Sequence, residues 1–162
     1  MPIRRANAVD GDAIAYLLRD AFQEYEPSYT RAGYTATTLD PSTVRERLKE
    51  GPTWIAEEGG FVVGTVSGLL RETDLYVRSM AVTPSARGRR IGRALFATAY
   101  NLAVERRARR IYLSTTPFLF DAIRFYESLD FRRTGEGPDD LFGTPLFTMA
   151  LAMPAVSTAS VR

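Results

Sequence analysis

The sequence predicts an α/β fold in which helices flank a mixed, mostly antiparallel sheet. Two runs of β-forming residues, 53–57 and 61–70, are joined by Glu58-Gly59-Gly60, which is a hairpin signal. A third run, 75–82, leads into a helical pattern and then into another strand-like run at 111–115. Because a crossover helix joins these last two runs, we expect them to pair in parallel.

Composition limits the chemistry that this chain can perform. It has 162 residues, 45% hydrophobic and 25% charged, as expected of an ordinary globular protein. It contains no cysteine and no histidine, which excludes thiol catalysis, histidine-based triads, disulfides and the commonest zinc ligands. We therefore expect no metal site.

Charge and apolar runs predict the domain organisation and location. The net charge is only +2, so the protein as a whole has no strong positive electrostatic field that would favour nucleic-acid binding. No apolar stretch has the length of a membrane helix, and the N-terminus lacks a signal-peptide core, so we expect a cytoplasmic protein without a membrane partner. Residues 1–153 are expected to form a single domain, with 154–162 as a flexible tail.

The first fifty residues are expected to form a short strand and two helices. Residues 3–6 give the strand, and Asp10 or Asp12 can cap a helix whose apolar side chains recur from 14 to 22. A second helix is expected over 41–50, because an aspartate that can cap it precedes Pro41 and a glycine follows.

Three tyrosines, Tyr25, Tyr29 and Tyr34, lie between these helices in a segment punctuated by proline and glycine. We expect this segment to be irregular. Two interpretations of the tyrosines stay open: they line a substrate cleft, or they cover the edge of the sheet.

A glycine- and arginine-rich loop follows the 75–82 run and opens the next helix with Arg87-Gly88-Arg89-Arg90-Ile91-Gly92-Arg93. A strand, a glycine-bearing loop and a helix together present free backbone N–H groups and a positive dipole end to a phosphate. Gly88 and Gly92 allow close approach of the main chain or a positive φ. The alternative is a solvated basic helix start.

The rest of the chain continues the same pattern. Apolar residues at helical spacing follow Ile91, and a cluster of arginines at 106–110 is best explained as a solvated helix end. A helix is expected over 118–129, with an apolar stripe. The stripe consists of Ala122, Phe125, Tyr126 and Leu129. Final strands are expected at 131–133 and 146–151, around a loop rich in glycine, proline and aspartate.

The arginine-rich loop resembles the coenzyme A-binding motif of the GNAT superfamily of N-acetyltransferases, Arg/Gln-x-x-Gly-x-Gly/Ala. Arg87 matches its first position and Gly92 its last, and Arg90 stands where the family usually carries its first glycine. Residues 122–131, Ala-Ile-Arg-Phe-Tyr-Glu-Ser-Leu-Asp-Phe, look like a second GNAT pattern, with Asp130 in place of a glycine. Leu119 occupies the position of an asparagine that contacts pantetheine in many members. The resemblance covers roughly residues 54–151.

This resemblance implies the GNAT acyl-CoA N-acyltransferase fold, in which the parallel strands splay apart and the pantetheine arm of acetyl-CoA inserts between them. The backbone of Met80 and Val82 would bond the pantetheine amides, with Ala81 facing the other way. The backbone of residues 88–93 would hold the pyrophosphate, and Arg87 would add a charge-assisted bond. These ten residues are the predicted cofactor site: Met80, Ala81, Val82, Arg87, Gly88, Arg89, Arg90, Ile91, Gly92 and Arg93.

The resemblance also implies an activity, the transfer of an acetyl group from acetyl-CoA to a primary amine of a small molecule, peptide or protein. Tyr126 would be the general acid that protonates the coenzyme A thiolate, because a phenol is protonated at neutral pH. Acceptor pockets in this family are built from the least patterned segments, here 22–38 and 135–144. An edge strand could support a homodimer.

The general base stays open, because Tyr76 occupies the strand position where some family members place a glutamate. Four carboxylates are candidates, and water without a single base is the alternative. The candidates are Asp74, Glu72, Glu24 and Glu26.

Two other function classes remain. One is a non-catalytic GNAT-like domain that senses acyl-CoA. The other is a nucleic-acid module that uses the arginines between 87 and 110, which would require aromatic residues interleaved on one exposed face.

Overall fold

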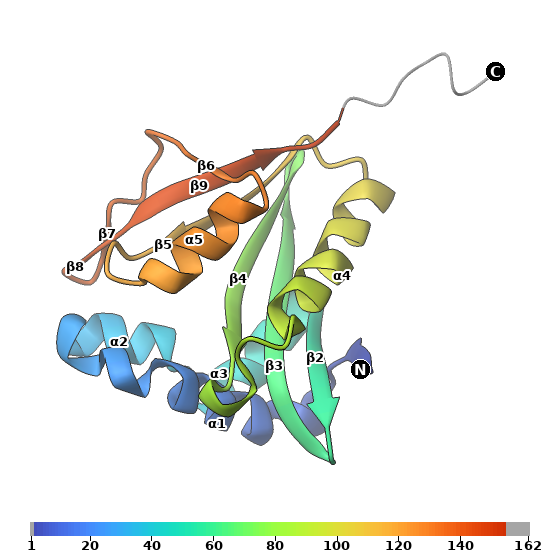
Figure 1. The fold of residues 1–162 in the computed structure, drawn as a ribbon, viewed down its shortest axis with the longest axis vertical. Coiled ribbons are helices and arrows are strands. Elements are labelled where there is room, and N and C mark those ends of the chain that lie inside the picture. Colours follow the sequence, from blue (N-terminus) through green and yellow to red (C-terminus); the bar gives the residue numbers. More distant parts are fainter. Residues whose placement is uncertain (1, 155–162) are drawn as a thin grey trace.

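Residues 2–154 are described by a computed structural model, and within them seven strands form one sheet in the order β1-β2-β3-β4-β5-β9-β6 (Figure 1). The strands are β1 (Ile3–Arg5), β2 (Thr53–Glu58), β3 (Phe61–Arg71), β4 (Asp74–Val82), β5 (Arg110–Thr115), β6 (Arg132–Arg133) and β9 (Phe147–Ala152). The helices are α1 (Gly11–Phe22), α2 (Arg31–Thr37), α3 (Pro41–Glu50), α4 (Ile91–Glu105) and α5 (Phe120–Ser128). Apart from the β4–β5 pair, neighbouring strands run antiparallel. The predicted fold class is therefore confirmed.

β4 and β5 pair in parallel, as the crossover through α4 predicts, but over a short distance. Leu75 pairs with Ile111 and Tyr76 with Tyr112, and no further pairs follow. Beyond Tyr76 the two strands separate, as Figure 1 shows. This separation leaves one side of the C-terminal half of β4 without a neighbouring strand.

A β-bulge bends β4 at the point where it leaves β5. Thr65 pairs with Ala81, but Ser67 pairs with Arg78, so β4 carries one extra residue relative to β3. Ser79 lies within this step and has a φ of 53°, in the left-handed region. Bulges turn a strand and redirect its side chains, and this one lies next to the two cavities described below.

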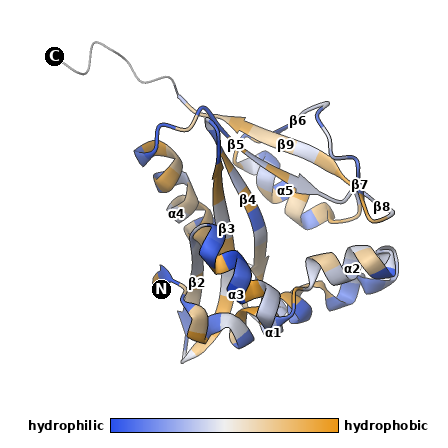
Figure 2. Cartoon of the chain, turned by 180° about the vertical axis from the view of Figure 1, so that it is seen from behind, coloured by the Kyte–Doolittle hydropathy of each residue, from blue (hydrophilic) through white to orange (hydrophobic). Residues whose placement is uncertain are grey.

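Apolar side chains form a core on each face of the sheet. On one face, α4 and α5 pack against the strands through a cluster that includes Leu95, Ile111 and Phe131. On the other face, α1 and α3 contribute Leu18 and Val44 to a smaller cluster. Figure 2 shows that α3 has both strongly hydrophilic and hydrophobic residues, as expected of a helix with one buried side. None of the helices within residues 2–154 combines the length and the apolar character that crossing a bilayer requires.

Two segments expected to be irregular contain regular structure. A 3-10 turn, η2 (Gln23–Ser28), and then α2 fill the segment of the three tyrosines. The loop before β9 contains a small hairpin of β7 (Asp140–Leu141) and β8 (Thr144–Pro145). The Thr30 N–H donates to Thr144 Oγ1 at 2.9 Å, so these two segments hold each other in place. The predicted tail lies, apart from Pro154, outside the described residues.

Of the two predicted caps, Asp10 or Asp12, Asp10 is the N-cap residue of α1, but its side chain makes no capping hydrogen bond to this helix. Its carboxylate accepts bonds from the Arg4 guanidinium at 2.7 Å and from the Asn7 N–H at 2.8 Å. It thereby completes the capping box of the 3-10 turn η1 (Ala8–Asp10), and α1 has no side-chain cap. The Arg4 guanidinium also holds the pKa of the Asp10 carboxyl below its usual value.

Candidate active site

A first cavity, with a volume of about 510 Å³, opens where β4 and β5 separate. The C-terminal end of β4 and the loop into α4 line part of it, and α5 lines another part. All residues of the predicted cofactor site line this cavity except Arg89, which forms an ion pair with Glu58 at 2.6 Å. The structure thus brings together Met80, Ala81, Val82, Arg87, Gly88, Arg90, Ile91, Gly92 and Arg93.

Some backbone N–H and C=O groups of β4 point toward the gap between β4 and β5, beside the first cavity. Thr83 donates its N–H to the Val63 carbonyl at 2.9 Å, and so directs it toward β3. Because polar groups alternate along a strand, Val82 directs its own N–H and C=O toward the gap, while Ala81 faces β3. The bonds from the backbone of Met80 and Val82 to pantetheine stay a prediction.

The loop between η3 (Pro84–Ala86) and α4 contains two residues in the left-handed conformation, and the second of them directly precedes α4. Gly88 has a φ of 80° and Arg90 a φ of 62°, so Arg90 adopts the conformation for which glycine is usually required. Arg90 is the N-cap of α4 and provides no side-chain hydrogen bond to the helix. The first N–H groups of α4 therefore lack side-chain caps.

Gly92 lies in the first turn of α4 and leaves open space beside the loop. A Cβ atom at this position would lie 3.5 Å from Cζ of Phe125 and 3.7 Å from Cε of Met80. Both distances are ordinary van der Waals contacts, so an added side chain would fill part of the first cavity without displacing protein atoms.

The four arginines of the loop differ in their partners. The Arg87 side chain donates to Glu24 Oε1 at 2.5 Å and to the Ala21 carbonyl at 2.9 Å, which ties the loop to the end of α1. Its contact with a phosphate stays a prediction. Arg90 and Arg93 form no ion pair within residues 2–154, so their charge is available at the first cavity.

Tyr126 is held firmly at the end of α5 by a Schellman motif. Phe131 donates its N–H to the Tyr126 carbonyl at 3.1 Å, and the N–H of Asp130, whose φ is 74°, donates to Glu127 at 3.0 Å. The Tyr126 ring also packs against the Phe131 ring at 5.6 Å and is only 8% exposed as a residue. This burial raises the pKa of the Tyr126 phenol to about 12, so the hydroxyl keeps its proton at neutral pH.

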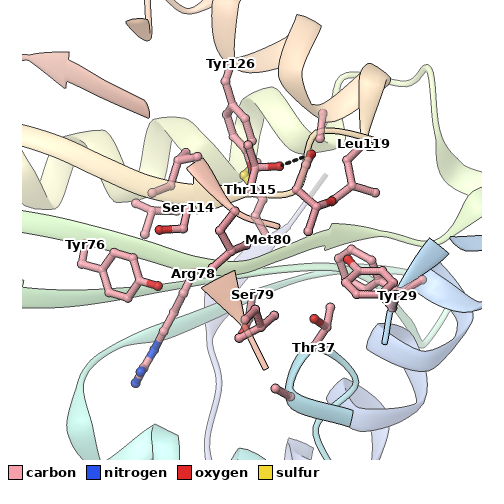
Figure 3. Close-up of a pocket in the computed structure, with 18 of the residues that line it drawn as sticks. Tyr29, Thr37, Tyr76, Arg78, Ser79, Met80, Ser114, Thr115, Leu119 and Tyr126 are labelled. Atoms are coloured by element: carbon pink, nitrogen blue, oxygen red, sulfur yellow. Dashed lines mark hydrogen bonds between the residues drawn. The ribbon is translucent and has the colours of Figure 1, made fainter. Parts of the chain in front are cut away.

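A second cavity, of about 210 Å³, adjoins the first at Tyr126, and Figure 3 shows residues that line it. β4, β5, α2 and α3 contribute to its lining, together with Leu141 from the β7–β8 hairpin. The first and second cavities share Phe22, Met80, Leu119, Ala122 and Tyr126. These shared residues form the junction between the two adjoining cavities. One of them, Leu119, is the N-cap residue of α5 and provides no side-chain hydrogen bond to the helix.

The three tyrosines of the N-terminal segment separate. Tyr25 lines the first cavity and Tyr29 the second, whereas Tyr34 lines neither and packs on Tyr29 with ring centroids 5.8 Å apart. Tyr29 also meets the Phe118 ring edge-on at 4.8 Å, and burial raises the pKa of its phenol. The cleft interpretation therefore suits Tyr25 and Tyr29, whereas Tyr34 contacts Tyr29 without lining either cavity.

None of the four candidate bases lines either cavity. Asp74 pairs with Arg110 at 2.8 Å and Glu24 pairs with Arg87, while Glu72 and Glu26 are exposed on the surface. Tyr76, at the position where some relatives carry a glutamate, does line the second cavity.

Two arginines of the second cavity, Arg47 and Arg78, were not predicted. Signals for both were present in the sequence. Arg78 interrupts an otherwise largely apolar strand, and Arg47 lies one helical turn after the buried Val44 on α3. A cation in such places is unusual, and only the fold shows that the two positions meet.

Comparison with known proteins decides the family. A family model described as "Acetyltransferase (GNAT) family" matches residues 14–131. The chain belongs to the GNAT family. It is 31% identical over 137 residues to "Uncharacterized N-acetyltransferase YjgM" of Escherichia coli, which covers 80% of each chain.

Other GNAT proteins are similar over shorter spans or in fold alone. "Probable N-acetyltransferase family 8 member 5" of Mus musculus is 35% identical over 92 residues, which are 53% of this chain and only 40% of that protein. The PaiA N-acetyltransferase from Thermoplasma acidophilum, solved in complex with coenzyme A, superposes with a TM-score of 0.75 at 15% identity. That match covers 94% of this chain and 98% of the other, and it shows that the GNAT fold is shared.

Proposed function

We propose that this protein transfers the acetyl group of acetyl-CoA to a primary amine by direct attack, with Tyr126 as the general acid. The observation that carries this proposal is the position of Tyr126, whose buried ring lies at the junction of the two cavities. Membership of the GNAT family and relatives named as N-acetyltransferases support the reaction class. The acetyl thioester would lie at this junction, with the coenzyme in the first cavity and the amine in the second.

The chemistry of the first cavity fits coenzyme A. Uncapped N–H groups and the positive dipole end of α4, together with the charges of Arg90 and Arg93, suit a pyrophosphate. The polar backbone groups of Val82 suit the amides of pantetheine. The space that Gly92 leaves open beside Met80 would admit the part of coenzyme A that joins the pyrophosphate to the pantetheine amides.

In the proposed reaction, the amine lone pair attacks the thioester carbonyl carbon, so a C–N bond forms as the C–S bond breaks. The sulfur leaves as a thiolate and takes the proton of the Tyr126 hydroxyl. The amine nitrogen gives up its extra proton to water, and water returns a proton to the phenolate. A pKa of about 12 keeps Tyr126 protonated before each turnover.

Water is the proposed proton acceptor, because the described residues that line the second cavity include no aspartate or glutamate. The cavity instead contains Arg47 and Arg78. A nearby cation disfavours the charged form of a bound ammonium and lowers its pKa, so the neutral amine becomes easier to form without a protein base.

The test is release of coenzyme A thiol from acetyl-CoA in the presence of a panel of primary amines. We expect amine-dependent thiol release together with an acetylated product of the matching mass. If the protein binds coenzyme A but releases no thiol with any amine, it is an acyl-CoA sensor and the proposed reaction is wrong. A salt-dependent nucleic-acid binding assay tests the arginine-rich alternative on the same preparation.

A further inference from the structure

The second cavity is positively charged, and this charge limits what can bind there. Arg47 from α3 and Arg78 from β4 both line it. The other lining side chains within residues 2–154 are apolar, hydroxylic or phenolic, so the lining itself supplies no negative charge. Figure 3 shows the Arg78 side chain extending away from Tyr126, so that its guanidinium is remote from the Tyr126 ring.

Arg78 is only partly satisfied by the protein. Its Nη2 donates to Glu50 at the surface, and the side chain is 14% exposed. Its Nε is buried and has no hydrogen-bond partner among the described residues. A guanidinium can donate five hydrogen bonds, so unused donors remain on a largely buried cation.

Arg47 is the less neutralised of the two. Its only polar side-chain contact within residues 2–154 is a long one, from Nη1 to Ser79 Oγ at 3.5 Å, and it has no ion pair there. Burial and the charge of Arg78 lower the pKa of the Arg47 guanidinium. Glu50 pairs with Arg78 only and lies outside the cavity lining, so the two arginines together have one carboxylate partner among the described residues. Partly buried cations without a partner are costly, and an anionic ligand would remove that cost.

We infer that the acceptor is a small primary amine that also carries a carboxylate, and that Arg47 and Arg78 bind this carboxylate while the amine faces Tyr126. The inference rests on the proposed function. Guanidinium groups bind carboxylates through paired, charge-assisted hydrogen bonds. The volume of about 210 Å³ lies below the roughly 300–1,000 Å³ of typical ligand pockets, so it suits a compound of about amino-acid size.

The same contact would help the reaction. In a free amino acid the carboxylate favours the charged ammonium next to it. Pairing the carboxylate with guanidinium cancels that attraction, so the amine loses its proton more readily. Substrate binding and activation of the nucleophile would then be one event.

The test compares acceptors that differ only in the carboxylate. A series of α-, β- and γ-amino acids is assayed against the carboxamides of the same compounds, and kcat/KM is measured for each. We expect at least one pair in which the carboxylate form is preferred by about 10- to 100-fold, the range of a charge-assisted hydrogen bond. The amine of a carboxamide has the lower pKa, so basicity alone would produce the opposite preference.

Variants then assign the preference to the two arginines. Arg47→Gln and Arg78→Gln should each reduce the carboxylate-to-carboxamide ratio about tenfold, and Arg47→Lys should retain part of it. Arg45→Gln is the matched control, because Arg45 lies on the same helix but pairs with Asp12 at 3.5 Å, outside the second cavity. Melting temperature and coenzyme A affinity establish that each variant is folded. If Arg78→Gln does not fold, the change in the carboxylate-to-carboxamide ratio of Arg47→Gln alone tests the inference.

A binding measurement separates this inference from the proposed reaction. The protein saturated with coenzyme A is titrated with each amino acid and its carboxamide in a calorimeter. Carboxylate-dependent binding that Arg47→Gln removes supports the inference even if no acetyl transfer is detected. Carboxamides that are bound and acetylated as well as the acids, or a preference that both arginine variants retain, would overturn it.

Discussion

At the residue scale, two departures from the GNAT motifs share one backbone conformation. Arg90 and Asp130 each stand where the family usually has glycine, and they have φ angles of 62° and 74°. The resemblance marked both positions as ones where the family usually has glycine, but no positive φ was predicted there, because nothing in the side chains themselves indicates one. Both conformations are retained at an energetic cost that glycine would avoid.

Arg90→Gly and Asp130→Gly should therefore stabilise the protein in the absence of ligand. The left-handed conformation costs about 1–2 kcal/mol for most residues, and glycine loses about 0.5–1 kcal/mol more chain entropy on folding, so we expect a gain of about 0.5–1 kcal/mol each. Urea unfolding measures it. Arg89→Gly, where φ is not positive, is the control and should not stabilise. A lower urea midpoint for both glycine variants would contradict the explanation.

Tyr126 gives the second prediction at this scale. Tyr126→Phe should keep its packing on Phe131 and so preserve both the melting temperature and the affinity for coenzyme A. Its kcat and kcat/KM should fall together by about 10²–10⁴-fold, because the proton moves only as the thiolate leaves. An unchanged kcat on the best amine would leave Tyr126 as a packing residue.

The pKa of Tyr126 also predicts a pH profile. The phenol is active in its protonated form, and burial raises its pKa to about 12, so activity should not decline through Tyr126 between about pH 7 and about pH 10. Initial rates at saturating acetyl-CoA and amine measure this. A loss of activity with a pKa near the ordinary phenol value of about 10, removed by Tyr126→Phe, would contradict the buried position.

At the scale of elements, the strand, loop and helix around Arg87 to Arg93 were predictable from sequence, and α2 and the β7–β8 hairpin were not. The loop and α4 follow from local signals: glycines, a preceding proline and apolar periodicity over many residues. The hairpin has two residues in each strand, and α2 has seven. Such short elements depend on contacts with distant segments, such as the bond from Thr30 to Thr144, which a local pattern cannot indicate.

The loop and α4 give a prediction about coenzyme A. Gly92→Val should weaken coenzyme A binding at least about tenfold, because the new side chain enters the first cavity beside Met80 and Phe125. Folding should be preserved, since the Cβ position has only ordinary contacts. Gly135→Val is the control, because a Cβ there meets nothing within 4 Å and Gly135 lines neither cavity. Equal affinity for Gly92→Val and the parent would show that the coenzyme lies elsewhere.

At the scale of the whole molecule, the second cavity is assembled from segments spread along most of the chain. Phe22, Arg47, Arg78 and Leu141 come from four different elements, and no local pattern places them together. Segments 22–38 and 135–144 were expected to build the acceptor pocket, and both contribute residues to this cavity, among them Tyr29 and Leu141; that the acceptor binds here stays a prediction. The sequence could not indicate that Arg47 and Arg78 line the same cavity, because this depends on how α3 packs against the sheet.

The contact between these distant segments gives the last prediction. Thr144→Val removes the oxygen that accepts the Thr30 N–H, and should lower stability by about 1–3 kcal/mol and raise KM for the amine more than KM for acetyl-CoA. Thr35→Val is the control, because its exposed hydroxyl bonds only to Arg31 of the same helix. If both KM values rise equally, the Thr30–Thr144 hydrogen bond stabilises the fold as a whole and does not shape the acceptor site specifically.

The separation of β4 from β5 has a consequence for protein association. Strand edges with free hydrogen-bonding groups invite pairing with other chains, and folded proteins usually protect them. Here such an edge lies in the interior of the sheet, between β4 and β5, where the end of α5 and the α4 loop leave a space of about 510 Å³. A slender, extended ligand can reach it, whereas a β-strand of another protein, with its side chains and neighbouring strands, cannot. The unpaired edge of β4 is therefore open to the proposed cofactor, and β5 and α5 shield it from pairing with a strand of another chain.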